Sequence, residues 1–306
     1  MVAQTETGIE SPIQAGRTSP ALWQFLREAP LGPLAILFAV VFVALFADVL
    51  APHDPEVSVK SETGRPVKSY LPPFWMKGGS INTPLGTDFH SRDILSRLIY
   101  GARVSLLVGL LGTLAAGALG TMLGIVAGYL GGWYDQLIMR ITDAWMALPT
   151  LIFAIFLASV LKPGLWNIVV ILSLVFWSQY ARIIRGQVLS LRERPFVQLA
   201  EVTGASTRRI IQLHILPNVM NTVMVLFSLT IGVAIIIEAS LSFLGVGVPP
   251  PKPAWGLMMS EGRGPLIAGK WWISVFPGLC IMPLVLATNL LGDWLRVRLD
   301  PQLRNR

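Results

Sequence analysis

Six apolar stretches, each about as long as a membrane-crossing helix, constrain what this chain can fold into. A helix needs about 20 apolar residues to cross the hydrocarbon core of a bilayer. The stretches cover residues 31–50, 104–130, 142–161, 165–189, 217–244 and 271–295. Charged residues make up only 13% of the chain, whereas soluble domains carry about 25%. The sequence therefore predicts an all-α polytopic membrane protein with six transmembrane helices.

The connections between these stretches define the expected organisation. The first 30 residues have no apolar core, so the first stretch is expected to be a retained helix and not a signal peptide. The expected segments are a tail (1–30), a first helix (31–51), a long polar loop (52–103), a five-helix core (104–296) with long loops at 190–216 and 245–270, and a second tail (297–306).

Arginines near span ends set the expected orientation. Arg182, Arg185, Arg192 and Arg194 lie at or beside the loop 190–216. Loops rich in Lys and Arg stay on the cytoplasmic side, so this loop and both termini are predicted to be cytoplasmic in an inner (plasma) membrane. Arg182 and Arg185 are expected to extend their side chains toward the membrane surface. Asp143 and Asp293 are expected near the same surface.

Several functions are excluded by what the sequence lacks. The net charge of +7 follows from basic loops, and no basic patch interleaved with aromatic residues predicts nucleic-acid binding. One cysteine and three scattered histidines predict neither a disulfide nor a metal site. No phosphate-binding loop, zinc-protease motif or nucleophile elbow is present. The chain is therefore expected to have no cofactor and no catalytic residues of its own.

Glycines in the second stretch recur every four residues. Gly120, Gly124, Gly128 and Gly132 are predicted to share one helix face, and small residues let membrane helices approach closely. Two interpretations stay open, namely packing within the chain and a face that moves against a neighbour.

The loop 190–216 has an unusual pattern for a linker. Residues 196–202 and 207–213 are compatible with helices, Gly204 separates them, and Pro217 is placed to begin the next helix. Two short helices joined at a glycine are predicted. Phe196, Val197 and Leu199 are apolar but belong to no span, so they are expected to pack against a partner protein.

This segment resembles the coupling loop of permeases from binding-protein-dependent importers. The family pattern is Glu-Ala-Ala, three residues, Gly, nine residues, a hydrophobic residue, any residue, then Leu-Pro. Ala200, Gly204, Leu216 and Pro217 match, whereas Gln198, Leu199 and His214 depart from the pattern. The residues that the resemblance assigns to ATPase coupling are Arg194, Pro195, Phe196, Val197, Gln198, Leu199, Ala200, Gly204, Ala205, Leu216 and Pro217.

Further motifs extend the resemblance over about residues 30–303. Together they resemble the dipeptide/oligopeptide subfamily of ATP-binding-cassette (ABC) importer permeases, and specifically the second permease of such systems. The motifs are Leu85-Gly86-Thr87-Asp88, Arg92-Asp93-Ile94-Leu95-Ser96-Arg97, Tyr100-Gly101-Ala102-Arg103, Ala147-Leu148-Pro149, Tyr180-Ala181-Arg182, the run from Glu238 to Gly245, Trp255-Gly256, Pro277-Gly278, the run from Asn289 to Asp293, and Asp300-Pro301.

The resemblance implies a type I importer permease fold that forms half of a translocation pore. The implied partners are a homologous permease, two ABC ATPase subunits that bind ATP and Mg²⁺, an extracytoplasmic substrate-binding protein and membrane lipids. Peptides are the implied substrate. Nickel, oligosaccharides and glutathione stay open, because specificity resides largely in the binding protein. A secondary transporter working alone is the other class, although neither an internal repeat nor coupling charges favour it.

Two groups of residues are candidates for the translocation path. Glu238 lies within a span, where a charge is costly and points to function, and Ser240 and Ser242 follow it. A structural hydrogen bond or ion pair between helices is the alternative. In the loop 245–270, proline and glycine argue against a long regular helix. Its apolar residues are open to three interpretations, namely the pore, binding-protein docking or an interfacial anchor: Trp255, Leu257, Met258 and Met259.

Overall fold

The computed structural model describes residues 30–61 and 64–299. The expected tails therefore lie almost entirely outside the described residues, as does the Asp300-Pro301 motif.

Every regular element in the described part is helical, which confirms the all-α class. The elements are α2 (Leu31–Leu45), α3 (Ala47–Leu50), α4 (Ile94–Leu130), α5 (Gly132–Met146), α6 (Thr150–Val160), α7 (Leu165–Arg192), α8 (Pro195–Val202), α9 (Thr207–Ile210), the π-helical turn η1 (Ile211–Ile215), α10 (Leu216–Phe243), α11 (Trp255–Ile267) and α12 (Trp272–Leu299).

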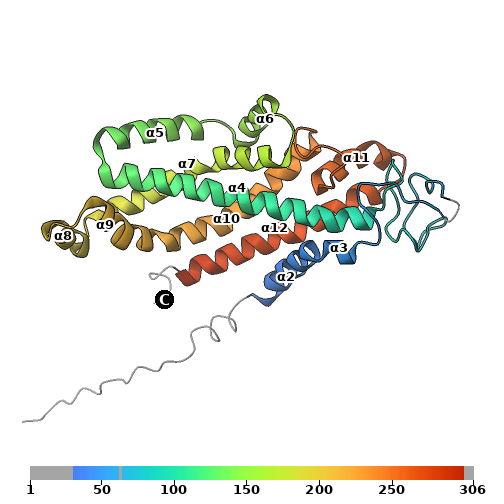
Figure 1. Ribbon diagram of the computed structural model, residues 1–306, viewed down its shortest axis with the longest axis horizontal. Coiled ribbons are helices and arrows are strands. Elements are labelled where there is room, and N and C mark those ends of the chain that lie inside the picture. The colour runs from blue at the N-terminus through green and yellow to red at the C-terminus, as the bar shows by residue number, and fades with distance from the viewer. Residues whose placement is uncertain (1–29, 62–63, 300–306) are drawn as a thin grey trace, which may run out of the picture.

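Four long helices, α4, α7, α10 and α12, run side by side along the molecule (Figure 1). The short helices α8 and α9 lie at one end of this bundle, which we call the α8 end. The polar segment 51–93 and α11 lie at the opposite end, which we call the α11 end. The pair α5 and α6 covers one side of the bundle, and α2 lies on the other side.

Four of the six apolar stretches become continuous membrane-length helices. Among the described residues, four continuous helices are long and apolar enough to cross a membrane: 94–130, 165–192, 207–243 and 272–298. The shorter α2 continues through a turn at Phe46 into α3. Together residues 31–50 extend about 30 Å at 1.5 Å per residue, which is about the thickness of the hydrocarbon core.

The third predicted span is not one straight helix, and this prediction was wrong. The predicted range 142–161 contains the end of α5 and the whole of α6, which are bent by 95° relative to each other. The break falls at Ala147–Pro149, where Pro149 is the N-cap of α6. Proline disfavours a helical conformation for the preceding residue, here Leu148, and cannot donate a backbone hydrogen bond. The Ala-Leu-Pro sequence thus ends one helix and starts another.

Helix α10 begins at Leu216 with Pro217 in its first turn, close to the predicted start. The start is not a free helix end, however, because α9 and the turn η1, which ends at Ile215, lead into α10 without a break from Thr207 to Phe243. A proline inside a helix removes one backbone donor and crowds the carbonyl group four residues earlier. A wider π-helical turn just before it accommodates that crowding and lets the helix continue.

Two predicted loops contain more helix than expected. Helix α4 begins at Ile94 and not at residue 104, because the Asp93 side chain caps it by accepting a 2.9 Å hydrogen bond from the Ser96 backbone N–H. Helix α11 spans 13 residues of the loop 245–270. Its Trp255 and Met258 side chains are buried, so packing on the bundle stabilises a helix that the local glycines disfavour.

The repeated glycines pack helices within the chain. A Cβ atom on Gly120 would lie 2.2 Å from the carbonyl oxygen of Trp177, and one on Gly124 would lie 2.7 Å from that of Ala181. One on Gly128 would lie 2.8 Å from the Cβ atom of Val188. Only glycine allows α4 to approach α7 this closely. Gly132 lies outside this contact, at the start of α5, and nothing lies within 4 Å of its Cβ position.

Candidate functional site

Helix α8 is defined by clear start and stop signals. Arg194 is its N-cap residue and Pro195 occupies the first turn, where a missing N–H has no cost. At the other end Gly204 has a φ of +82°. The Gly204 N–H donates to the Glu201 carbonyl and the Ala205 N–H to the Ala200 carbonyl, both at 3.0 Å. These two bonds form a Schellman motif, so a glycine junction between two helices exists where the sequence predicts it.

One face of α8 is anchored to the bundle. The Val197 side chain is fully buried in a cluster with Ile125 of α4, Ile184 and Val188 of α7, and other apolar residues. Ala200 and Ala205 pack against the same cluster. The Tyr129 hydroxyl of α4 and the Glu201 carboxylate lie 3.0 Å apart in a hydrogen bond. Helix α8 is therefore connected to α4 and α7 by packing and by a side-chain bond.

The opposite face of α8 is apolar and uncovered. Phe196 is 42% exposed, Leu199 65% and Val202 84%. Arg194, Pro195 and Gln198 are also exposed. We call Phe196, Leu199 and Val202 the outer α8 face. Val202 is absent from the sequence prediction, although the same apolar run contains it. Exposed apolar side chains grouped in this way are typical of a protein-binding surface.

The last two predicted coupling residues lie away from this face. Leu216 and Pro217 begin α10 and are exposed, and Leu216 lines a cavity in the bundle. Near them, the His214 ring centroid lies 6.1 Å from that of Phe196, and Ile210, Ile215 and Val219 belong to the same buried cluster as Val197.

Arginines of α7 hold α5 rather than reaching freely to the membrane surface. The Arg185 guanidinium contacts the Asp135 carboxylate at 2.5 and 2.6 Å. Arg182 pairs with Asp143. Both acids belong to α5, so the ion pairs attach that helix to α7. Arg182 and Arg185 were predicted to extend toward the membrane surface. They form ion pairs within the chain instead, because α5 lies close enough to α7 to supply the acidic partners.

Glu238 is fully buried between α4 and α10. Its carboxylate accepts hydrogen bonds from the Ser105 hydroxyl at 3.1 Å and from the Ser242 hydroxyl at 2.8 Å. The Ser242 hydroxyl oxygen also accepts a 3.3 Å bond from the Val248 backbone N–H. Ser240 bonds instead to the Ile236 carbonyl of its own helix. This geometry favours the structural alternative for Glu238 and Ser242.

Substitutions at Glu238 separate the two interpretations. Glu238→Leu leaves the Ser105 and Ser242 hydroxyls unsatisfied, so the free energy of unfolding is expected to fall by about 1–3 kcal/mol. Glu238→Gln keeps one oxygen to accept from the Ser242 hydroxyl, and its NH2 group can donate to the Ser105 hydroxyl oxygen, so it is expected to retain both stability and transport. Thermal unfolding in detergent together with a transport assay tests both. Normal stability with lost transport in Glu238→Gln would instead place this carboxylate in the path.

A buried ion cluster joins three segments at the α11 end. The Arg92 Nε and Arg97 Nη1 atoms lie 2.7 and 2.8 Å from the Asp88 Oδ2 atom. The same arginines reach Glu261 of α11 at 3.1 and 3.0 Å. Arg97 is fully buried. Asp88, Arg92 and Arg97 belong to recognised motifs, but nothing local in the sequence pairs them with Glu261. Among the described residues, no group of three or more His, Cys, Asp or Glu is placed to hold a metal.

Helix α11 contributes core residues and not an open docking surface. The Trp255 indole N–H donates a 2.9 Å bond to the Leu98 carbonyl, and its ring fills the space that a Cβ on Gly101 would occupy. Trp255, Leu257 and Met258 are buried, with exposed fractions of 2%, 7% and 2%. The interpretations that gave these three residues a pore, docking or anchoring role are therefore not favoured.

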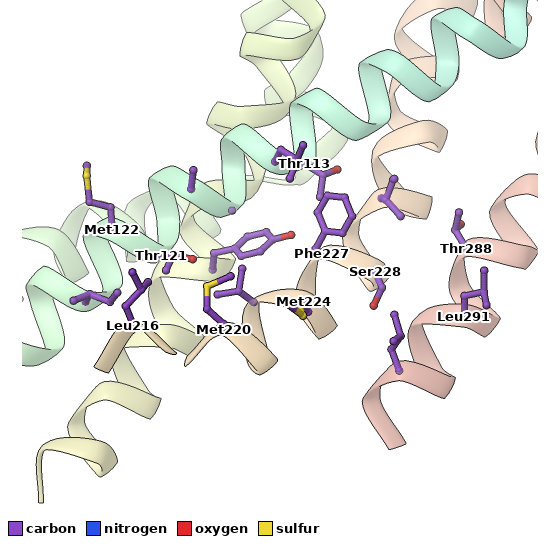
Figure 2. Close-up of a pocket in the computed structure, with 18 of the residues that line it drawn as sticks. Thr113, Thr121, Met122, Leu216, Met220, Met224, Phe227, Ser228, Thr288 and Leu291 are labelled. Carbon is purple, nitrogen blue, oxygen red and sulfur yellow. The ribbon is translucent and has the colours of Figure 1, made fainter. Parts of the chain in front are cut away.

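A cavity of about 1000 Å³ opens between α4, α10 and α12, with α2 beside it. Figure 2 shows Thr113, Thr121 and Met122 on one wall, Met220, Met224 and Phe227 on a second, and Thr288 and Leu291 on a third. None of the residues that line it is charged. Glu238, Ser240 and Ser242 do not line it. The cavity lies in the half of the bundle nearer the α8 end.

Comparison with known proteins identifies the family of the chain. Residues 120–305 match the family described as the binding-protein-dependent transport system inner membrane component. The chain belongs to this family. It is 41% identical over 285 residues to the di/tripeptide transport system permease protein DppC of Pseudomonas aeruginosa, with 92% of each chain covered. The dipeptide permease DppC of Haemophilus influenzae is 40% identical over 278 residues, covering 91% of this chain and 92% of that one.

A glutathione transport system permease protein, GsiD of Escherichia coli O157:H7, is 38% identical over 284 residues, covering 92% of this chain and 90% of the relative. As a binding-protein-dependent permease component, the chain is a multi-pass inner-membrane protein with the type I ABC permease fold, and it is not itself an enzyme. The matched region of the family includes α8 with both of its faces.

Proposed function

We propose that this chain is one permease subunit of an ATP-driven importer of short peptides, and that the outer α8 face binds an ABC ATPase subunit. The observation that carries the proposal is the two-sided character of α8. One side is fixed in the bundle through Val197, while Phe196, Leu199 and Val202 are exposed. The family supplies the class of partner, because permeases of binding-protein-dependent systems work with ATPases.

The same contacts give a route for coupling. A movement of the ATPase displaces α8, which is packed on α4 and α7 and bonded to Tyr129 through Glu201. The close glycine contact between α4 and α7 makes these two helices move together. The ion cluster at the α11 end transmits the same motion to α11. Rigid-body rocking of this kind opens and closes a path between two permeases.

In the proposed complex a second, homologous permease forms the other half of the pore. Two ATPase subunits bind ATP and Mg²⁺, and an extracytoplasmic binding protein delivers the ligand. The α8 end then lies in the cytoplasm, together with both termini, and segment 51–93 and α11 face the periplasm. The arginines near the α8 end support this orientation.

Peptides are the proposed substrate because two of the relatives are named for di- and tripeptide transport. Glutathione, itself a modified tripeptide, is the second candidate because of the relative named for it. The test is uptake into proteoliposomes that contain the complete complex and its binding protein. ATP-dependent uptake of a labelled dipeptide supports the proposal. Uptake of glutathione alone would assign the second substrate, and uptake driven by an ion gradient without ATP would refute the importer.

A further inference from the structure

We infer that the cavity between α4, α10 and α12 is a phospholipid site, which holds acyl chains along its length and a phosphate group at the α8 end. This role goes beyond transport of the cargo. It rests on the proposed topology only for its leaflet, which is then the inner one. The inference rests on the chemistry of the cavity lining, on the opening of the cavity toward the side of the bundle and on a basic residue near its α8 end.

The chemistry of the lining suits hydrocarbon and not a peptide. The hydroxyls of Thr113, Ser228 and Thr288 bond to carbonyls of their own helices, at 2.7, 2.8 and 2.9 Å. These three groups are thus already satisfied. The Thr121 and Tyr180 hydroxyls also line the cavity and have no hydrogen-bond partner among the described residues, and the rest of the lining is mainly Leu, Ile, Val, Met, Phe and small residues. A peptide would bring more backbone amides and charged ends into this space than these two hydroxyls can satisfy, which is costly. An acyl chain brings none of these groups.

The cavity is also open toward the surroundings of the bundle. Leu114, Met122 and Met224 line it and are 49%, 57% and 50% exposed. Because these positions lie within membrane-length helices, the opening faces the bilayer on any side of the bundle that the second permease leaves uncovered. An acyl chain can enter sideways there.

A basic residue continues one lined face beyond the α8 end of the cavity. Arg208 is exposed and precedes the lining residue Ile211 by three positions. Residues three or four apart share a helix face. Basic pockets between transmembrane helices on the cytoplasmic side bind anionic lipid headgroups, so a phosphate at this end would lie on the face that carries Arg208.

Photolabelling of the intact transport complex in nanodiscs tests the inference. The probe is phosphatidylglycerol with a diazirine in its acyl chain, and the adducts are located by mass spectrometry after digestion. Adducts are expected at Met122, Met220 or Met224. The exposed cavity residue Ala118 allows a filling variant, and Ala118→Trp is expected to lower these adducts about tenfold. The matched control is Leu279→Trp, at a 57% exposed position of α12 outside the cavity, which should leave them unchanged.

Two further measurements keep the test decisive. Met224→Trp replaces Ala118→Trp if the latter does not fold. Arg208→Ala is expected to lower labelling by the phosphatidylglycerol probe about fivefold, and labelling by a phosphatidylcholine probe less. Labelling needs neither ATP nor peptide, so it can succeed even if the proposed substrate is wrong. An unlabelled cavity, labelling that persists in both filled variants, or a cross-link from the cavity to the second permease would overturn the inference.

Discussion

Replacing Leu199 with aspartate is expected to abolish ATP-dependent transport while the protein stays folded in the membrane. The Leu199 side chain is 65% exposed in the chain alone, so a charge there costs the fold little. At the centre of an apolar protein interface, the same charge loses packing and is buried without a partner. Central interface residues contribute about 2 kcal/mol or more, so binding of the ATPase should weaken at least about thirtyfold.

The measurement is co-purification of the ATPase with the variant, followed by uptake into proteoliposomes. Leu199→Met is the matched control, because it keeps an apolar side chain of similar volume and should retain both ATPase binding and transport. Full ATPase binding and transport in Leu199→Asp would show that the outer α8 face does not couple to the ATPase.

The second large effect is expected at Arg97. Arg97→Met is expected to lower the free energy of unfolding by about 3–5 kcal/mol, because it removes one of two cations from a buried ion cluster and leaves the Asp88 and Glu261 carboxylates to share Arg92. Arg97 is fully buried and contacts both Asp88 and Glu261, at 2.8 and 3.0 Å. Since these contacts join α4 to segment 51–93 and to α11, the variant should also loosen the α11 end.

Unfolding of the purified protein in detergent measures this loss. Arg103→Met is the control, since the Arg103–Asp48 ion pair at 3.0 Å involves side chains that are 38% and 67% exposed. Exposed pairs contribute about 0–1 kcal/mol. Equal destabilisation by the two substitutions would contradict a special role for the buried cluster.

Much of the fold could be predicted because long apolar stretches in the sequence identify membrane helices. The six apolar stretches all became helices, and Gly204 predicted the junction in the loop 190–216 because only a residue tolerant of positive φ suits that helix end. The outer α8 face was predictable in part, since Phe196 and Leu199 had no span to belong to. Val202 required the structure, because its exposure depends on how α8 is rotated on the bundle.

The other features depend on contacts between distant residues. The bend between α5 and α6 follows from Pro149, but the sequence does not give its 95° angle. Helix α11 forms because Trp255 fills the space beside Gly101, and Glu261 joins the arginines of segments far away in the chain. Glu238 looked like a path residue because it is a charge in a span, whereas its serine partners became visible only in three dimensions.

The most direct measurement of the central claim uses a photo-crosslinking amino acid in place of Leu199 in the native membrane. After irradiation, the protein joined to this chain is identified by mass spectrometry. The account predicts a covalent adduct with an ABC ATPase subunit, and none when the crosslinker replaces the buried Val197. Adducts only with lipid, or only with another copy of this chain, would contradict it.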